Sequence, residues 1–210
     1  SRQLMGLLGY DITPAMASDA NLVGLDLRDV EANLRQMGAP LHSEPVLLTQ
    51  SGKIQVVRNA TTKQIETNTT GRKDYVLFGT TQGLVQVVDA LTGVEKFAFA
   101  PKEIIENQSE AFKNKGGNLV NGKNALYYGI DGEWTAHTNY VTDSNGAMTV
   151  GTVERAAYGS GSSNTISGHQ WVYGGMRMGG RSYYALDLTD INTPKIKFQI
   201  DPSTSKVYSQ

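Results

Sequence analysis

Short apolar runs alternate with glycine-containing turns in three stretches of the chain, residues 45–58, 75–99 and 171–200. In the first stretch, turn-type residues at 50–53 separate an apolar run on either side. Runs of this length bounded by turn residues are typical of antiparallel strands. The pattern therefore predicts a hairpin within 45–58 and a similar antiparallel unit in each of the other two stretches.

The last two stretches each contain a corner built from aspartate and threonine. Asp89, Thr92 and Gly93 form the first corner, and Asp187 and Thr189 form the second. Aspartate and threonine side chains can bond the backbone amides of a turn and hold its shape. We predict that both corners are structural and that their carboxylates bond amides rather than a metal ion.

An antiparallel unit that recurs in this way is typical of a propeller blade. The predicted fold is all-β, as part of a β-propeller with about three blade-like units and one or two short helices in insertions. Residues 1–36 are expected to be an irregular segment and short helix leading into the partial propeller at 37–210. Residues 102–170 interrupt the repeat and are expected to be an insertion, with a weak helix from Glu103 to Lys113.

The expected insertion is rich in Asn, Gly, Ser and Tyr, which are common in adaptable contact surfaces. Insertions on rigid scaffolds often carry the binding surface of a protein. We therefore predict a recognition surface that includes Tyr127, Tyr128, Tyr140 and Tyr158.

Composition narrows the classes of function. The 210 residues carry 19 basic and 20 acidic side chains, a net charge of −1, which gives no broad basic surface for nucleic acid. The sequence has no cysteine, which excludes disulfides and thiolate chemistry. No stretch approaches the roughly 18 uninterrupted apolar residues of a membrane span. We expect neither a nucleic-acid partner nor a transmembrane segment.

One segment nearly matches a phosphate-binding loop. Residues 175–182 follow the pattern Gly-x-x-x-x-Gly-Lys-Ser, with Arg181 in place of the lysine. Such a loop needs a helix directly after it to hold the anion. Residues 182–186 alternate like a strand instead, so we interpret the segment as a wide turn between strands.

The remaining titratable groups match no established catalytic or metal-binding motif. His42, His137 and His169 lie far apart in the sequence, and each is expected to be structural or exposed. A nearby group of carboxylates leaves calcium binding or acid–base chemistry open: Asp131, Glu133 and Asp143. Because Asp131 precedes a glycine, a turn is the simpler interpretation. No catalytic residue, metal ligand or cofactor is predicted.

The corner at 89–93 also occurs in the propeller repeats of quinoproteins. A quinone enzyme would in addition need tryptophan or vicinal cysteine residues to stack on the cofactor. The chain has no cysteine and only two tryptophans, Trp134 and Trp171. A quinoprotein-like propeller oxidoreductase therefore stands as the alternative to a binding module.

Several motifs resemble the PilC/PilY family of type IV pilus tip proteins. Residues 37–46 resemble the "G-x-x-x-H-S-x-P-V" segment that leads into the first blade of that family, and residues 75–93 resemble its next blade. Residues 173–189 are similar to the family pattern "GG-x-x-x-GGR-x-x-YALD-[VL]-T", and residues 128–132 resemble its "Y-x-V-D-G" strand. The resemblance covers roughly residues 37–202.

The resemblance implies an exported protein at the pilus tip or outer cell surface, acting in pilus assembly, surface adhesion and twitching motility. Its implied partners are minor pilins or the pilus tip complex, and a host or surface receptor. It also implies a non-catalytic role. Some members of the family carry a calcium-binding loop downstream of the "YALD" motif. The resemblance therefore implies no calcium within these 210 residues and allows for calcium in the parent protein downstream of Gln210.

Overall fold

Antiparallel strands make up most of the structure. The computed structural model describes residues 5, 9–10, 37–107, 128–155 and 164–209, of which 54% lie in strands and 6% in helices. The all-β prediction is therefore confirmed at the level of fold class. The elements are β1 (Val46–Arg58), β2 (Ile65–Gly79), β3 (Val85–Asp89), β4 (Glu95–Phe99), α3 (Lys102–Asn107), β5 (Trp134–Asn139), β6 (Val141–Thr142), β7 (Ala147–Thr149), β8 (Thr152–Arg155), β9 (Asn164–Ser167), β10 (His169–Gly175), the 3-10 helix η4 (Arg177–Gly179), β11 (Tyr183–Asp187), β12 (Lys195–Asp201) and β13 (Lys206–Ser209).

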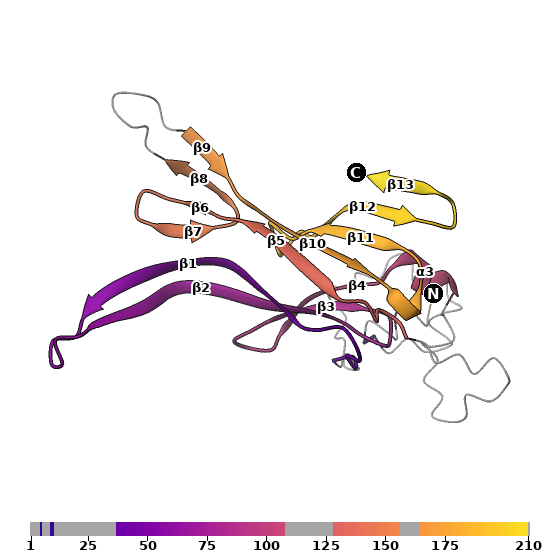
Figure 1. Cartoon of the computed structure of the whole chain (residues 1–210), viewed down its shortest axis with the longest axis horizontal. Helices are drawn as coiled ribbons and strands as arrows, with labels where there is room; N and C mark the ends of the chain where they lie inside the picture. The colour runs from indigo at the N-terminus through magenta and orange to yellow at the C-terminus, as the bar shows by residue number, and fades with distance from the viewer. Residues whose placement is uncertain (1–4, 6–8, 11–36, 108–127, 156–163, 210) are drawn as a thin grey trace.

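The first sheet has the strand order β4-β3-β2-β1-β7-β6, so the chain runs through β1 to β4 as a meander. Residues 45–58 and 75–99, expected as separate units, are therefore neighbours in one sheet. The division of the chain into about three blade-like units is corrected accordingly: among the described residues there are two large sheets and one small ribbon, β8–β9. Figure 1 shows the two large sheets lying one above the other.

The hairpin predicted within 45–58 is wrong, because β1 is one continuous strand from Val46 to Arg58. The polar residues at 50–53 form bulges instead of a turn: Thr49 pairs with Asp74 and Ser51 with Lys73, so Gln50 is an extra residue in β1. A bulge re-aims a side chain. The Gln50 side chain is buried, and its amide donates hydrogen bonds to groups of the second sheet.

The second sheet has the order β13-β12-β11-β10-β5. Its first strand, β5, comes from the region expected to be an insertion, and β6 and β7 from the same region extend the first sheet beside β1. Residues 102–170 are therefore partly built into both sheets. The predicted helix at 103–113 is present as α3 over Lys102–Asn107, and its remaining residues lie outside the described part of the chain, as does the region of the helix expected before residue 37.

The two sheets repeat each other strand by strand, β2-β3-β4 corresponding to β10-β11-β12. Asp89 ends β3 opposite Tyr75, and Asp187 ends β11 opposite Trp171. The Ala90 amide, directly after Asp89, donates a hydrogen bond to the carbonyl oxygen of Asp74, directly before Tyr75. In the same way, the Leu188 amide donates to the carbonyl oxygen of Gln170, directly before Trp171. The two corners predicted from the sequence thus occupy the same place in each sheet.

A bulge in the next strand strengthens this correspondence. Glu95 and Phe97 pair with adjacent residues of β3, which leaves Lys96 as the extra residue of β4. In β12 the pairing of Ile196 and Phe198 leaves Lys197 as the extra residue in the same way. Each lysine ammonium lies over the aromatic ring of its own sheet, at 5.9 Å from the centroid of Tyr75 and 3.9 Å from that of Trp171. Such a match in pairing, bulge and side chain identifies a structural repeat.

The sheets pack head to tail. Side chains alternate between the two faces of a sheet along each strand. We call the face that carries Leu77 in the first sheet, and Tyr173 at the corresponding position of the second sheet, the first face. The opposite face, which carries Val76 and Val172, is the second face. The core joins the first face of the first sheet to the second face of the second sheet. Phe99 and Tyr184 meet across this interface, with ring centroids 5.3 Å apart. The core residues of the two sheets and their connections are Leu48, Tyr75, Leu77, Val85, Val87, Ile104, Ile130, Trp134, Val172, Met176, Tyr184, Leu186, Leu188 and Ile191.

Within the part of the chain that the structure describes, no helix is long and apolar enough to cross a membrane.

Candidate functional site

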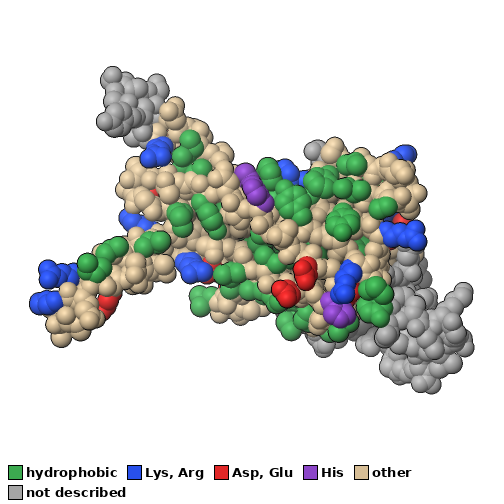
Figure 2. All heavy atoms as spheres, in the orientation of Figure 1, with side chains coloured by type: hydrophobic (Ala, Val, Ile, Leu, Met, Phe, Trp, Pro, Cys, Tyr) green, Lys and Arg blue, Asp and Glu red, His purple; other side chains and the backbone are tan. Residues whose placement is uncertain are grey.

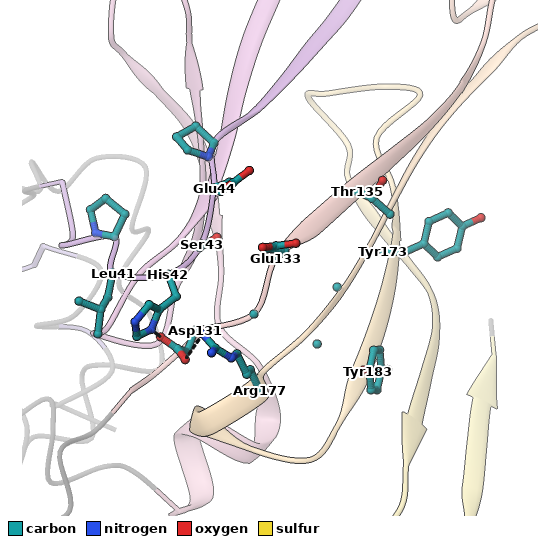
Figure 3. Close-up of a pocket in the computed structure, with 15 residues that line it drawn as sticks. Leu41, His42, Ser43, Glu44, Asp131, Glu133, Thr135, Tyr173, Arg177 and Tyr183 are labelled. Carbon is teal, nitrogen blue, oxygen red and sulfur yellow. Dashed lines mark hydrogen bonds and ion pairs between the residues drawn. The ribbon is translucent and has the colours of Figure 1, made fainter.

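A pocket of about 1100 Å³ lies where the starts of β1 and β5 meet the end of β10. Its walls come from three segments, Pro40–Pro45 before β1, Asp131–Glu133 before β5, and Tyr173–Gly175 in β10. Thr135, Arg177 and Tyr183 complete the lining. Figure 3 shows these side chains around the opening.

Asp131 is the centre of the polar part of this pocket. Its side chain is fully buried, and its two oxygens face different partners: His42 Nδ1 lies 2.6 Å from Oδ1, and Arg177 Nη1 lies 3.4 Å from Oδ2 (Figure 3). The side chains of His42 and Arg177 are 47% and 57% exposed. A buried carboxylate is tolerated only with partners of this kind. Asp131 therefore ties two side chains that reach solvent to the floor of the pocket.

Backbone contacts bring the three segments together. Ser43 Oγ accepts a hydrogen bond of 2.8 Å from the Gly79 amide and anchors the segment before β1 to the end of β2. A Cβ atom at Gly179 would lie 1.7 Å from the Gly129 carbonyl oxygen, so the turn after β10 can approach the segment before β5 only because residue 179 is glycine. The Ser43 hydroxyl is buried and engaged, so its role is structural.

The open side of the pocket combines carboxylates and aromatic rings. Glu44 and Glu133 are exposed and precede β1 and β5 at corresponding positions, while Tyr173 and Tyr183 contribute their rings from β10 and β11 (Figure 3). Aromatic faces with a few charged groups are typical of pockets that bind small molecules or protruding side chains. The arrangement is suited to hold a ligand by its polar edge and apolar face.

The Asp89 corner lies away from this pocket. Asp89 Oδ1 accepts hydrogen bonds of 3.0 and 2.9 Å from the amides of Leu91 and Thr92. The hydrogen bonds from Thr92 are the main cause that lowers the pKa of the Asp89 carboxyl below its ordinary value. Gly93 follows with a φ of 72°, in the left-handed region that glycine adopts readily.

The Asp187 corner joins the second sheet to its tryptophan. Asp187 Oδ1 accepts a hydrogen bond of 3.0 Å from the Thr189 amide, and Oδ2 accepts one of 3.2 Å from Trp171 Nε1. Burial alone would raise the pKa of Asp187, but the hydrogen bonds from Thr189, the nearby Lys197 and the indole together lower it below its ordinary value.

Of the four tyrosines predicted as a recognition surface, the structure describes two, Tyr128 and Tyr140. Tyr140 donates its hydroxyl to the Thr49 carbonyl oxygen at 2.8 Å, and its partial burial raises its pKa. Tyr128 is partly buried. Neither Tyr128 nor Tyr140 lines the pocket. Tyr127 and Tyr158 lie outside the described residues.

Pairs that are distant in the sequence are neighbours in the structure. His42 contacts Asp131, for which the sequence favoured a turn and left calcium binding or acid–base chemistry open. His169 Nε2 lies 3.1 Å from His137 Nδ1, because β5 and β10 are adjacent. The sequence held one signal for the pocket: a glutamate stands before the first strand of each large sheet, Glu44 before β1 and Glu133 before β5. Among the described residues, no group of three or more His, Cys, Asp or Glu is placed to hold a metal ion.

Comparisons of the chain with models of protein families, with curated proteins and with solved structures find no match.

Proposed function

We propose that this chain is part of a β-propeller in a type IV pilus tip protein, where it acts in pilus assembly, surface adhesion and twitching motility. Its contribution is binding rather than catalysis. The protein acts outside the cell, with minor pilins or the tip complex on one side and a host or surface receptor on the other.

The observation that carries the proposal is the convergence of the motifs that resemble the PilC/PilY family. The "HS" motif contributes His42 and Ser43 to the pocket, and the "Y-x-V-D-G"-like segment contributes Asp131. The "GG-x-x-x-GGR"-like segment contributes Gly175 and Arg177. Motifs that are distant in the chain thus meet at one place, which is expected when they preserve one structural and functional site.

The propeller part of the proposal is supported by the repeat and by its packing. Blades of a propeller follow one another around an axis, so each blade offers one face to the blade before it and the opposite face to the blade after it. The two large sheets have this relationship, because the first face of one meets the second face of the other. Two sheets related by a twofold axis would instead join like faces.

The pocket is the proposed contact site for a partner. Its exposed carboxylates, Glu44 and Glu133, and its tyrosine rings suit a cationic or hydrogen-bonding group with an apolar face. Tyr173 and Tyr183 lie on strands β10 and β11, and the two glutamates lie just before strands β1 and β5, which favours a preformed site.

The role is tested in a piliated bacterium that carries the intact parent protein. Deletion of the gene should reduce surface pili, attachment and twitching, and complementation should restore them. The double variant Glu44→Gln and Glu133→Gln should lower attachment with a normal number of pili, whereas the exposed control Glu154→Gln should not. Unchanged piliation, attachment and twitching after deletion would refute the role. A bound quinone absorbance with alcohol oxidation would support the propeller oxidoreductase instead.

A further inference from the structure

Strands β1 and β2 continue past the rest of the first sheet as a two-stranded hairpin. We call residues 54–69 the arm, because in this stretch the two strands pair only with each other among the described residues. β7 pairs with β1 as far as Lys53, and β3 pairs with β2 from Tyr75 onward. Figure 1 shows the arm extending away from the two large sheets, with its turn at the free end.

The packing of one sheet on the other does not reach the arm. On the same two strands, Leu48, Tyr75 and Leu77 are buried in the core between the sheets, whereas every residue of the arm except Asn59 is exposed. A further sheet that packed on the opposite face of the first sheet in the same way would also stop short of the arm. The exposure of the arm therefore follows from its length past the sheet, and it holds for a blade between two neighbours.

The arm has an aliphatic face and a polar face. Paired residues of antiparallel strands share a face of the sheet. The aliphatic face carries Ile54, Val56, Arg58, Ile65, Thr67 and Thr69, and the polar face carries Gln55, Val57, Glu66 and Asn68. Ile54, Val56 and Ile65 are 59%, 68% and 74% exposed. Figure 2 shows hydrophobic side chains in a row along the arm.

Basic side chains lie at the end and at the base of the arm. Residues 53–74 carry five basic and two acidic side chains, a net charge of +3, whereas the whole chain carries −1. Arg58 Nε donates a hydrogen bond of 3.3 Å to the Lys63 carbonyl oxygen, and Lys63 Nζ donates one of 2.7 Å to that of Ala60. These bonds hold both charges at the tip, where Figure 2 shows Lys and Arg side chains gathered.

The two carboxylates of this segment lie away from the aliphatic face. Asp74 is paired with Arg72 at the base of the arm, with Oδ2 2.6 Å from Nε. Glu66 lies on the polar face and accepts a hydrogen bond of 2.6 Å from Asn59. Arg58, by contrast, stands at the end of the aliphatic face. The aliphatic face is therefore bordered by positive charge.

This combination matches the surface of a bilayer with anionic headgroups. Aliphatic side chains enter the boundary between headgroups and acyl chains, and basic side chains beside them are attracted to phosphate groups. The stems of arginine and lysine can lie along the apolar layer while their charged ends reach the headgroups. Protein interfaces are usually anchored by aromatic side chains in pockets, and residues 54–69 contain no aromatic residue. A bilayer requires no such anchor.

We propose that the arm binds the surface of a phospholipid bilayer that carries anionic headgroups. Ile54, Val56 and Ile65 enter the interface, and Arg58 and Lys63 contact phosphate oxygens. The polar face stays in water. The inference goes beyond the proposed pilus role and depends only on the arm.

The test measures binding of the whole 210-residue chain to vesicles of phosphatidylcholine, with or without an equal share of phosphatidylglycerol. Val56→Ser and Val57→Ser form a matched pair, because they change the same residue type at adjacent positions on opposite faces, 68% and 49% exposed. Circular dichroism and thermal unfolding establish that each variant folds. Cosedimentation with the vesicles over a lipid series measures the affinity.

The wild type should bind vesicles with phosphatidylglycerol at least about tenfold more tightly than phosphatidylcholine alone, and added salt should weaken this binding. Val56→Ser should weaken it at least about threefold, and Val57→Ser should stay within about twofold of the wild type, since only the aliphatic face enters the interface.

The charge requirement is tested by the double variant Arg58→Gln and Lys63→Gln, which should bind at least about tenfold more weakly. Its control is the double variant Arg155→Gln and Lys195→Gln, which removes two exposed charges outside the arm and should bind like the wild type.

Insertion is tested by a fluorescent label. Because the sequence has no cysteine, Val56→Cys and Val57→Cys each provide a single site for an environment-sensitive fluorophore. Vesicles with phosphatidylglycerol should shift the emission of the label to the blue at residue 56 and leave it unchanged at residue 57.

Three results would overturn the proposal: no binding to either kind of vesicle, equal binding with and without phosphatidylglycerol, or equal effects at residues 56 and 57. Self-association that Val56→Ser abolishes, without vesicle binding, would also overturn it and assign the aliphatic face to a second copy of the chain. Piliation and attachment of the Glu44 and Glu133 variants test the pilus role separately, so either proposal can fail alone.

Discussion

Trp134 lies flat on Gly174, its partner in the register between β5 and β10. A Cβ atom at residue 174 would come within 2.2 Å of Trp134 Cδ2, so the buried indole occupies the space that any side chain would need. Gly174→Ala should therefore lower the free energy of unfolding by about 1–3 kcal/mol, the usual cost of overpacking. Gly151→Ala, whose added methyl would meet its nearest neighbour at 3.5 Å, is the matched control. Equal urea midpoints for the two variants would contradict this contact.

Gln50 connects the two sheets through its side-chain amide. Its Nε2 donates to the Leu188 carbonyl oxygen and, at 3.3 Å, to Gln170 Oε1. Gln50→Leu keeps the volume but leaves these buried acceptors short of a donor, so it should cost about 1–3 kcal/mol in denaturant unfolding. Gln55→Leu changes an exposed glutamine of the same strand and should be nearly neutral. A neutral result at position 50 would mean that the bulge does not hold the sheets together.

The buried Asp131 makes its partners more important than their exposure suggests. His42→Ala and Arg177→Ala each remove one partner of a carboxylate that has no exposed surface, and each should destabilise the fold by about 1–3 kcal/mol. Arg155→Ala, at an exposed arginine in β8, serves as the control. In a background that carries Asp131→Asn, His42→Ala and Arg177→Ala should each lower the free energy of unfolding by less, since no uncompensated charge is left. If each substitution lowers the free energy of unfolding equally with Asp and with Asn at residue 131, the charge is not the cause.

Asp187 gives the stability a dependence on acid. Its folded pKa lies below the ordinary 3.8, so the carboxylate stabilises the fold above that pH and the contribution is lost as the pH falls through the folded pKa. Asp187→Asn should be less stable than the wild type at pH 7, by no more than about 1 kcal/mol because the group is largely solvated. The difference should shrink below pH 3.8. Unfolding curves between pH 7 and 2.5, followed by tryptophan fluorescence, measure it. A difference that is constant with pH would contradict the assignment.

The sequence predicted strand content and corners well because both depend on local chemistry. Asp89 and Asp187 bond nearby amides, and such contacts follow from spacing along the chain. The position of the first hairpin was not predictable in the same way. Polar residues around Gly52 suit a turn or a bulge equally, and the burial of Gln50 against the other sheet decides between them.

The repeated glutamates Glu44 and Glu133 offered a signal for the candidate pocket, but its central contact was beyond prediction for a related reason. His42 and Asp131 are brought together by the packing of one sheet on the other, which no local pattern encodes. The contact between His137 and His169 also depends on knowing which strands pair, because the two side chains become neighbours only through the register of β5 with β10. Residues that act locally were found from sequence, and residues that act across sheets required the structure.

The lysine bulges in β4 and β12 add a residue to a strand without changing which face the following side chains occupy. Lys197 is an extra residue opposite β11, yet Phe198 still pairs with Ala185 and Ile200 with Tyr183. The chain can therefore gain or lose a residue at this point without exchanging the buried and open sides of the sheet, whereas a single insertion elsewhere in the strand would exchange them. The bulge is thus a tolerant site for length variation in an otherwise rigid frame.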